Sequence, residues 1–153
     1  MALKKKDREI LKILQSNARL SVRNIAQQLN MPPTTIHSRI KKMEREGIIK
    51  GYTVILDEKK LGILAKAFIF VSLSSKYKKA NLNFIASKIA KYPQVQEVCV
   101  ISGDWDLIIK LKSNNTDDIG NFALNLRKIN GVEKTFTSIV FETYKELPNV
   151  VLV

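Results

Sequence analysis

The chain has 153 residues and a 45% hydrophobic content, enough for one ordinary domain or two small ones with packed cores. Its formal net charge of +12 predicts a polyanionic partner. Residues 1–50 hold 12 Lys and Arg against 4 Asp and Glu, so this segment carries +8 of the chain's net charge of +12. Because no segment pairs a basic face with a broad aromatic or Leu-rich one, this distribution favours nucleic acid over a membrane surface.

Cys99 is the single cysteine, which excludes an intramolecular disulfide and fits a reducing compartment. It falls in the apolar run 95–101, where we expect a buried and unreactive thiol. No early apolar run resembles a signal peptide, and no apolar stretch approaches the ~20 residues of a membrane span. These features predict a soluble, cytoplasmic protein without a membrane partner.

The first 47 residues predict three short helices. Residues 7–15 and 21–29 each carry apolar side chains at helical spacing, and Ser21 is suited to cap the second of these helices. Residues 32–47 form the third, which begins at a proline pair and ends at a glycine. Three short helices with a tight second turn are typical of the helix-turn-helix unit, whose last helix enters the major groove of DNA.

The helix predicted over 32–47 has a polar and basic outward face. Ile36, Ile40 and Met43 recur at i, i+4 and i+7 and form one narrow apolar stripe that must pack inward. A basic face alone is also typical of a solvated helix, but its place in the unit favours DNA. We therefore predict DNA contacts from Arg23, Thr34, Thr35, His37, Ser38, Arg39, Lys41, Lys42 and Arg45.

These side chains divide by chemistry. The short hydroxyl side chains and the histidine lie in the first turns of the helix, where base edges are met, whereas long cationic side chains suit phosphates. Arg39 lies close to the apolar stripe, so we expect a phosphate contact or an internal ion pair rather than base reading. Phosphate contacts position a protein on DNA and make its binding salt-dependent.

Residues 48–56 are β-branched and apolar and predict a strand that leaves the DNA-binding unit. A polar turn follows and ends at Gly62. We therefore divide the chain into a DNA-binding domain over 1–50, a connecting strand and hinge over 51–63, and a second domain over 64–153.

The second domain alternates between strand and helix patterns. The predicted strands cover 65–73, 95–101, 107–112 and 132–141, and the predicted helices cover 81–91 and 116–129. This βαββαβ order is the ferredoxin-like arrangement, an antiparallel sheet with both helices on one side. Because the strands remain apolar on both faces, we expect the other face to pack on a second copy and make a homodimer. A two-fold dimer also suits a helix-turn-helix that reads a palindromic site.

The chain resembles the Lrp/AsnC family, also called feast/famine regulatory proteins, in five stretches: DREILKILQSNAR, SVRNIAQQL, TIHSRIKKMEREGIIKGYTVIL, SGDWDLIIK and GVEKTFTSIV. The likeness covers essentially the whole chain and implies an α+β protein, a winged-type helix-turn-helix followed by the βαββαβ domain. It also implies a cytoplasmic transcription regulator, assembled as dimers that often form octamers or other multiples and often respond to an amino acid. One departure is Pro32-Pro33, where the family commonly has Ser before Pro. That side-chain cap is lost, although Thr34 or Thr35 could replace it.

Residues 102–106, SGDWD, are the second candidate site. Gly103 allows a tight turn, and the carboxylates of Asp104 and Asp106 could receive the ammonium of an amino acid. The alternative is an ordinary β-turn whose Asp side chains cap backbone N–H groups. The resemblance implies a pocket between dimers. Trp105 would then pack at the assembly interface rather than select the ligand. The effector-binding set is then Gly103, Asp104, Trp105, Asp106, Thr135, Thr137 and Ser138.

Catalysis is the competing class, because βαββαβ sheets also carry enzymes. The one His lies on the predicted DNA-reading helix and the one Cys in a core-like strand, so neither a nucleophile with its base nor a His/Cys metal site can be assembled within one chain. Asp104 and Asp106 could hold Mg²⁺, although paired carboxylates in turns are common without that role. We expect no enzyme, metal or cofactor. An architectural protein that compacts DNA with little sequence preference stays open as the alternative.

Overall fold

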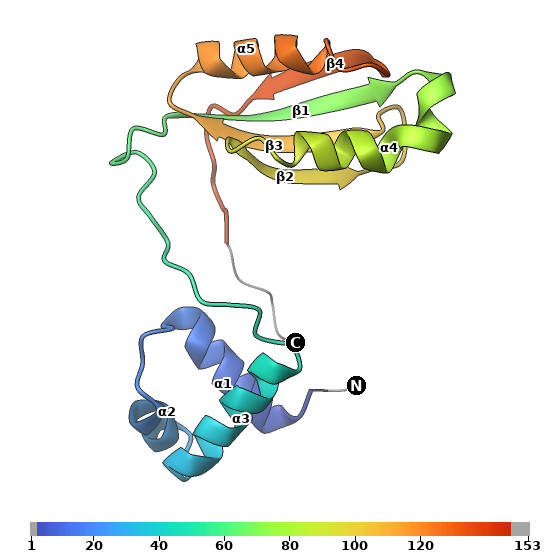
Figure 1. Cartoon of the computed structure of the whole chain (residues 1–153). Helices are drawn as coiled ribbons and strands as arrows, with labels where there is room; N and C mark the ends of the chain where they lie inside the picture. Colours follow the sequence, from blue (N-terminus) through green and yellow to red (C-terminus); the bar gives the residue numbers. More distant parts are fainter. Residues whose placement is uncertain (1–2, 148–153) are drawn as a thin grey trace. The chain divides into compact units, whose positions relative to one another are not determined.

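The computed structural model describes residues 3–147, and for 78–80 it describes the backbone alone (Figure 1). The end of the predicted second domain, residues 148–153, lies outside the described residues. The chain divides into a first unit up to Ile55 and a second unit over Leu56–Lys145. Each unit has its own apolar core. None of the helices described is long and apolar enough to cross a membrane.

The first unit holds three helices, α1 (Lys5–Ser16), α2 (Val22–Gln28) and α3 (Pro33–Arg45), as the sequence predicts. Ser21 caps α2: its hydroxyl oxygen accepts a hydrogen bond from the backbone N–H of Asn24 at 3.1 Å. That bond satisfies one of the donors that a helix start leaves without an intrahelical partner.

The two ends of α3 differ in how they are held. Pro32 occupies the N-cap position without a side-chain hydrogen bond, so the replacement cap expected from the two threonines is absent at this end. Gly47 follows the last turn with a φ of +71°, and its N–H donates to the carbonyl of Glu44 at 3.0 Å. Glycine adopts this left-handed conformation without steric cost, so the chain leaves the helix sharply at this point.

The apolar stripe of α3 packs on the other two helices, as predicted. The first unit's core consists of seven buried side chains, two or three from each helix: Ile10, Leu11, Ile25, Ala26, Ile36, Ile40 and Met43. Full burial of such a side chain contributes roughly 1.5–3 kcal/mol each. Since the stripe faces inward, the opposite face of α3 is fixed outward.

The strand predicted over 48–56 is wrong for the single chain, because these residues form no strand hydrogen bonds within the described structure. Ile49 packs against the helical core, whereas Val54 and Ile55 are 72% and 77% exposed. Strand propensity reflects packing against a neighbouring strand, and the first unit offers none here. The segment therefore carries uncovered apolar side chains.

The second unit has the predicted βαββαβ order. Its elements are β1 (Ala65–Leu73), α4 (Ser75–Ile89), β2 (Val95–Val100), β3 (Leu107–Ser113), α5 (Thr116–Leu126) and β4 (Val132–Ile139). The strands form one antiparallel sheet in the order β2-β3-β1-β4, and both helices cover the same face of it (Figure 1). The α4 helix begins six residues before its predicted start, because the first turns carry no apolar stripe that would reveal a helix.

Side chains of β1 alternate between the two faces of the sheet. The odd-numbered ones from Ala65 to Leu73 are buried under the helices, and the even-numbered ones, Phe68 and Phe70 among them, are half-buried on the open face. The alternation follows from the two-residue period of a strand. The open face is thus apolar in part and uncovered within one chain.

Cys99 does not lie in the core, which corrects the expectation of a buried thiol. It belongs to β2, an edge strand of the sheet, and is half-exposed there. The Sγ atom donates to the Oε1 of Glu97 at 3.2 Å. That hydrogen bond, with a smaller contribution from desolvation, raises the pKa of the Cys99 thiol above its ordinary value. A raised pKa lowers the fraction of the thiol that is present as thiolate.

Candidate DNA-binding and effector sites

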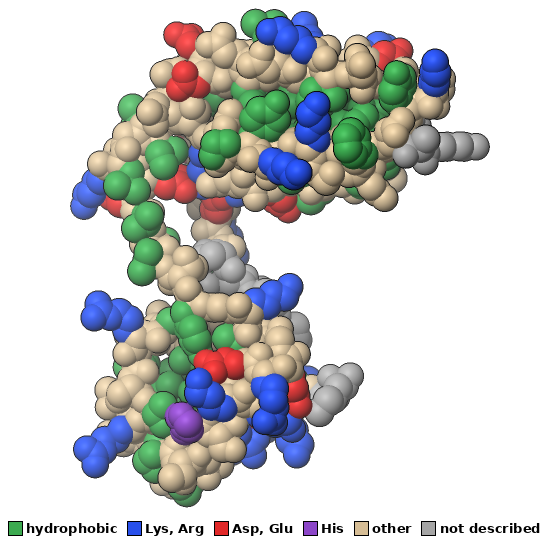
Figure 2. Space-filling view, in the orientation of Figure 1, with side chains coloured by type: hydrophobic (Ala, Val, Ile, Leu, Met, Phe, Trp, Pro, Cys, Tyr) green, Lys and Arg blue, Asp and Glu red, His purple; other side chains and the backbone are tan. Residues whose placement is uncertain are grey.

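The outward face of α3 carries the side chains predicted to contact DNA, except Arg23, which lies on α2. Thr35 and Arg39 are half-buried, and the rest of the predicted set is exposed: Arg23, Thr34, His37, Ser38, Lys41, Lys42 and Arg45. Figure 2 shows Lys and Arg side chains gathered over the first unit. One helix therefore presents short hydrogen-bonding groups near its start and cations near its end.

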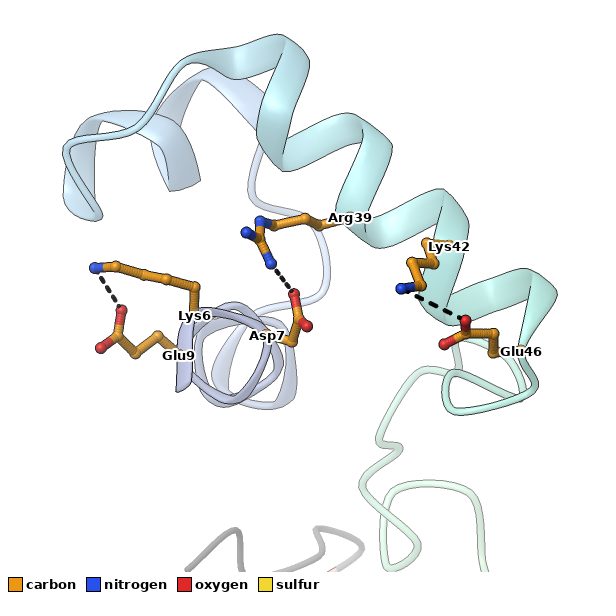
Figure 3. A network of polar contacts seen from close by, with 6 residues as sticks. All are labelled: Lys6, Asp7, Glu9, Arg39, Lys42 and Glu46. Atoms are coloured by element: carbon orange, nitrogen blue, oxygen red, sulfur yellow. Dashed lines mark hydrogen bonds and ion pairs between the residues drawn. The ribbon is translucent and has the colours of Figure 1, made fainter. Parts of the chain in front are cut away.

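Arg39 forms the internal ion pair that was one of its two predicted roles. Its Nη1 donates to the Oδ1 of Asp7 at 2.7 Å, which ties α3 to the first turn of α1 (Figure 3). The Asp7 side chain is 16% exposed and that of Arg39 is 30% exposed, so the pair is partly buried. The Nε of Arg39 is buried without a hydrogen-bond partner. Arg39 thus fixes the placement of the helix through α1.

Two lysines of α3 are paired with carboxylates, one within the same helix and one at its C-cap. Lys41 Nζ lies 2.9 Å from Glu44 Oε2, and Lys42 Nζ lies 3.7 Å from Glu46 Oε1 (Figure 3 shows the second pair). Exposed pairs at this spacing contribute only about 0.2–0.5 kcal/mol. Neither pair therefore holds its lysine strongly. Among residues 3–147 no carboxylate pairs with Arg23 or Arg45.

Glu44 also links α3 to the segment that follows it. The Tyr52 hydroxyl donates to Glu44 Oε1 at 2.9 Å, while Lys41 donates to the other oxygen of that carboxylate. These hydrogen bonds, first from Lys41 and then from Tyr52, lower the pKa of Glu44 below its ordinary value of 4.5. Desolvation, and next the hydrogen bond to Glu44, raise the pKa of Tyr52. Sequence reasoning missed this link, although the i, i+3 spacing of Lys41 and Glu44 is a usable signal.

The 102–106 turn is anchored to the sheet by one of its two carboxylates. Oδ2 of Asp106 accepts a hydrogen bond from the backbone N–H of Leu73 at 2.7 Å, and the Asp106 N–H donates to the carbonyl of Val71 at 2.9 Å. Gly103 has a φ of +106°, a conformation that favours glycine. Asp104 is exposed. The two aspartates therefore differ, one holding the turn to β1 and the other facing solvent.

Trp105 joins an aromatic cluster that the sequence did not reveal. Its ring centroid lies 6.1 Å from that of Phe70 on β1 and 6.2 Å from that of Phe136 on β4. The Phe70 and Phe136 centroids are 6.1 Å apart, so all three rings are in mutual contact range. The pairing of β1 with β4 brings together residues that are far apart in sequence, and the cluster forms because of this pairing.

The three predicted effector residues of β4 do not share one face. Thr135 and Thr137 stand opposite the buried Val71 and Ile69, so they lie on the helix-covered side, and Arg127 Nε donates to the Thr135 hydroxyl at 2.8 Å. Ser138 stands opposite Phe68, on the open side. One chain thus places parts of the predicted set on both sides of the sheet. Within the described ranges, no group of three or more His, Cys, Asp and Glu could hold a metal ion.

Comparison with known proteins identifies both units. A family described as winged helix-turn-helix DNA-binding matches residues 3–50, and one described as the Lrp/AsnC ligand binding domain matches residues 66–150. The HTH-type transcriptional regulator FL11 of Pyrococcus horikoshii is 39% identical over 92% of this chain and 90% of its own length. The FL11 regulator of Pyrococcus furiosus is 35% identical over the same shares.

Solved structures with a similar fold cover almost the whole length of this chain. AsnC of E. coli superposes with a TM-score of 0.86 at 28% identity and covers 100% of this chain and 99% of its own. A transcriptional regulator of Neisseria meningitidis, solved as a complex with L-Met, has a TM-score of 0.90 at 24% identity and covers 98% of this chain and 97% of its own.

The fold and the exposed α3 face therefore define a DNA-binding transcription regulator with a winged helix-turn-helix. Its second unit is of the ligand-binding type. The chain belongs to the Lrp/AsnC family. Its relatives are named as regulators rather than enzymes.

Proposed function

We propose that this regulator reads specific DNA sequences as a homodimer and that an amino acid modulates its binding. The observation that carries the proposal is the outward face of α3, opposite the buried stripe of Ile36, Ile40 and Met43. A helix fixed on one side by its core can hold base-reading groups in a constant register along the major groove.

Within that face, together with Arg23 of α2, we assign two roles. Thr34, Thr35, His37 and Ser38 in the first turns meet base edges, where short polar side chains discriminate between base pairs. Cationic side chains contact phosphates: Arg23 and Arg45 directly, and Lys41 and Lys42 after they exchange their glutamates for phosphate oxygens. Arg39 acts indirectly, through its pair with α1.

Two substitutions test this division by fluorescence anisotropy over a salt series. We expect Lys41→Ala to weaken binding to all duplexes alike and to lower the salt slope by about 1. Ser38→Ala should change the ranking of duplexes instead. Lys91→Ala, which removes an exposed cation from the second unit, is the control for net charge. Equal behaviour of the Lys41 and Ser38 variants would refute the assignment.

Footprinting separates a regulator from an architectural protein. Discrete protected half-sites at helical phasing are expected if α3 reads sequence from both halves of a two-fold dimer. Uniform coverage of long DNA would instead support a protein that compacts DNA with little sequence preference.

We assign the homodimer contact to the open face of the sheet. Its half-buried Phe68, Phe70 and Trp105 and the exposed Phe136 form an apolar surface without a cover in one chain. Such surfaces typically mark interfaces, and a face packed on its own copy gives the two-fold axis that paired half-sites need. Phe136→Asp should yield monomers in sedimentation velocity, whereas Phe84→Asp, on α4, should leave dimers intact. Dimers in the Phe136 variant would exclude this face. Larger assemblies, such as octamers, would build on the same dimer.

For the effector, we propose an amino acid bound at the 102–106 turn. A ligand-binding family match and the turn's exposed Asp104 support this proposal. The Neisseria meningitidis relative solved with L-Met makes amino acids the first class to test. Because Thr135 and Thr137 lie on the opposite side of the sheet from Ser138, these three residues of one chain cannot all line the same pocket.

A thermal-shift screen of the twenty amino acids tests the effector proposal. We expect at least one to raise the melting temperature, and Asp104→Ala to remove that response because the ammonium loses its carboxylate. Asn114→Ala, at an exposed position on another loop, is the control. A full screen without any response would discard the proposal.

A further inference from the structure

A groove of about 560 Å³ lies along the helices of the second unit, apart from the 102–106 turn. It is lined by α4, by the residue Tyr92 after that helix, and by the end of α5 with the turn that follows. Its volume falls within the range of small-molecule sites. Neither the DNA-reading face nor the proposed effector residues take part in it.

Part of the groove's lining is apolar and firmly held. Ile85 is buried at the floor, and Tyr92 packs edge-on against Phe122 with ring centroids 5.3 Å apart. The Tyr77 ring forms another wall. A Cβ added to Gly131 would lie 2.8 Å from this ring, so the glycine lets the ring rest directly on the backbone.

The rim is basic and rich in hydrogen-bond donors. Lys88 and Lys128 line it together with three asparagines, and no Asp or Glu is among the lining residues. Lys128 Nζ donates to the Oδ1 of Asn125 at 3.0 Å, which holds its ammonium beside the groove. No carboxylate pairs with either lysine in the part of the chain that the structure describes. Their charge is therefore available to a ligand.

Phe84 lies at the edge of the groove and is 66% exposed. The same groove is therefore lined by an exposed apolar ring and by two lysines. Aromatic rings offer their faces to flat apolar groups, and ammonium groups bind carboxylates through charge-assisted hydrogen bonds. Figure 2 shows hydrophobic side chains with Lys and Arg among them on the second unit.

We infer that this groove binds a small carboxylate with an apolar body and no ammonium group, of the 2-oxo acid class. The two lysines and the asparagine amides receive the carboxylate and the keto oxygen, while Phe84, Tyr92 and Ile85 contact the body. An amino acid fits poorly, because its ammonium would meet two lysines and no carboxylate. The groove thus selects a class of ligand different from that of the 102–106 turn.

Isothermal titration calorimetry on the full chain tests this inference with phenylpyruvate and phenylalanine, which share a side chain and differ at the α-carbon. We expect phenylpyruvate to bind and phenylalanine to bind at least tenfold more weakly, a difference of about 1.4 kcal/mol. Lys88→Gln and Lys128→Gln should each weaken phenylpyruvate binding about tenfold, since each removes a charge-assisted hydrogen bond. Melting temperatures of both variants verify that they are folded.

Two control variants locate the binding. Lys91→Gln, an exposed lysine outside the lining, and Asp104→Ala, in the turn, should leave phenylpyruvate binding unchanged. The inference is overturned if phenylpyruvate gives no binding heat, if phenylalanine binds equally well, or if the lysine variants bind like the parent chain. A response lost only in the Asp104 variant would place the ligand at the turn and likewise overturn it.

Discussion

The two units present their candidate sites in different ways. In the first unit, one helix carries all the candidate DNA-contacting residues except Arg23 of α2, and its inward stripe of Ile36, Ile40 and Met43 fixes their face outward. In the second unit, the candidate effector residues come from a turn and an edge strand and lie on both sides of the sheet. A surface on one helix is complete in one chain, whereas a site between strands and loops depends on what packs against them. The following substitutions test this difference, from the largest expected effect to the smallest.

The largest effect is expected from Ile36→Ala, which opens a cavity in the first unit's core. Loss of a fully buried Ile costs about 2–5 kcal/mol. Because each unit has its own core, the loss should fall on the first unit alone and separate two melting transitions in differential scanning calorimetry. Thr34→Ala, exposed on the same helix, should shift neither transition appreciably. A single transition lowered as a whole would show that the units are coupled.

Asp106→Ala should destabilise the second unit by about 1.5–3 kcal/mol, since the Leu73 N–H then loses a charged acceptor. Urea unfolding measures the change. If the turn binds an amino acid, this variant loses both stability and response, whereas Asp104→Ala loses the response alone. An unchanged unfolding midpoint for Asp106→Ala would mean that the hydrogen bond to β1 contributes nothing.

Asp7→Asn should cost about 1–2 kcal/mol in the first unit, because it leaves the guanidinium of Arg39 without its charged partner in a partly buried position. DNA affinity should fall as well, although Asp7 lies on α1 and a lost carboxylate would by itself favour a polyanion. The positioning role and the change in net charge therefore predict opposite changes in DNA affinity. Higher affinity in anisotropy titrations would contradict a positioning role for the ion pair.

The smallest effect is expected from Tyr52→Phe, which removes one of the two hydrogen bonds that lower the pKa of Glu44. The pKa of Glu44 is lower in the folded chain than in the unfolded chain, where it is near 4.5. The ionised carboxylate therefore stabilises the fold fully above the unfolded pKa, and this stabilisation is lost as the pH falls through the folded pKa. In the variant the pKa should move up towards 4.5, and the loss should begin at higher pH. NMR titration of the Glu44 carboxyl carbon measures the shift, with Glu46 as the internal control.

The parts that could be predicted from the sequence follow one rule: their signal lies within a single element. The spacing of Ile36, Ile40 and Met43 reports the inward face of α3, and an apolar run reports β1 at its observed bounds. The capping role of Ser21 is equally local. Such patterns repeat with the period of the helix or strand that carries them, so they need no knowledge of the neighbours.

The expectations that the structure corrected depend on neighbouring elements and not on a pattern within one element. Residues 48–56 have strand-like composition, but a strand needs a partner, and one chain supplies none there. Cys99 sits in an apolar run, yet the strand order puts β2 at the edge and leaves the thiol half-exposed. Composition reports what a segment prefers, and the neighbouring elements decide whether that preference is met.

For this protein the sequence by itself determined the three helices, the βαββαβ order, the basic outward face of α3 and the family likeness, because each is written in local periodicity, in charge or in contiguous motifs. Only the tertiary structure decided that Arg39 pairs with Asp7, that Trp105 joins Phe70 and Phe136, and that the β4 residues divide between two faces. It also assembled the groove between α4 and α5. The physical reason is that these contacts join residues distant along the chain, and register and packing alone bring them together.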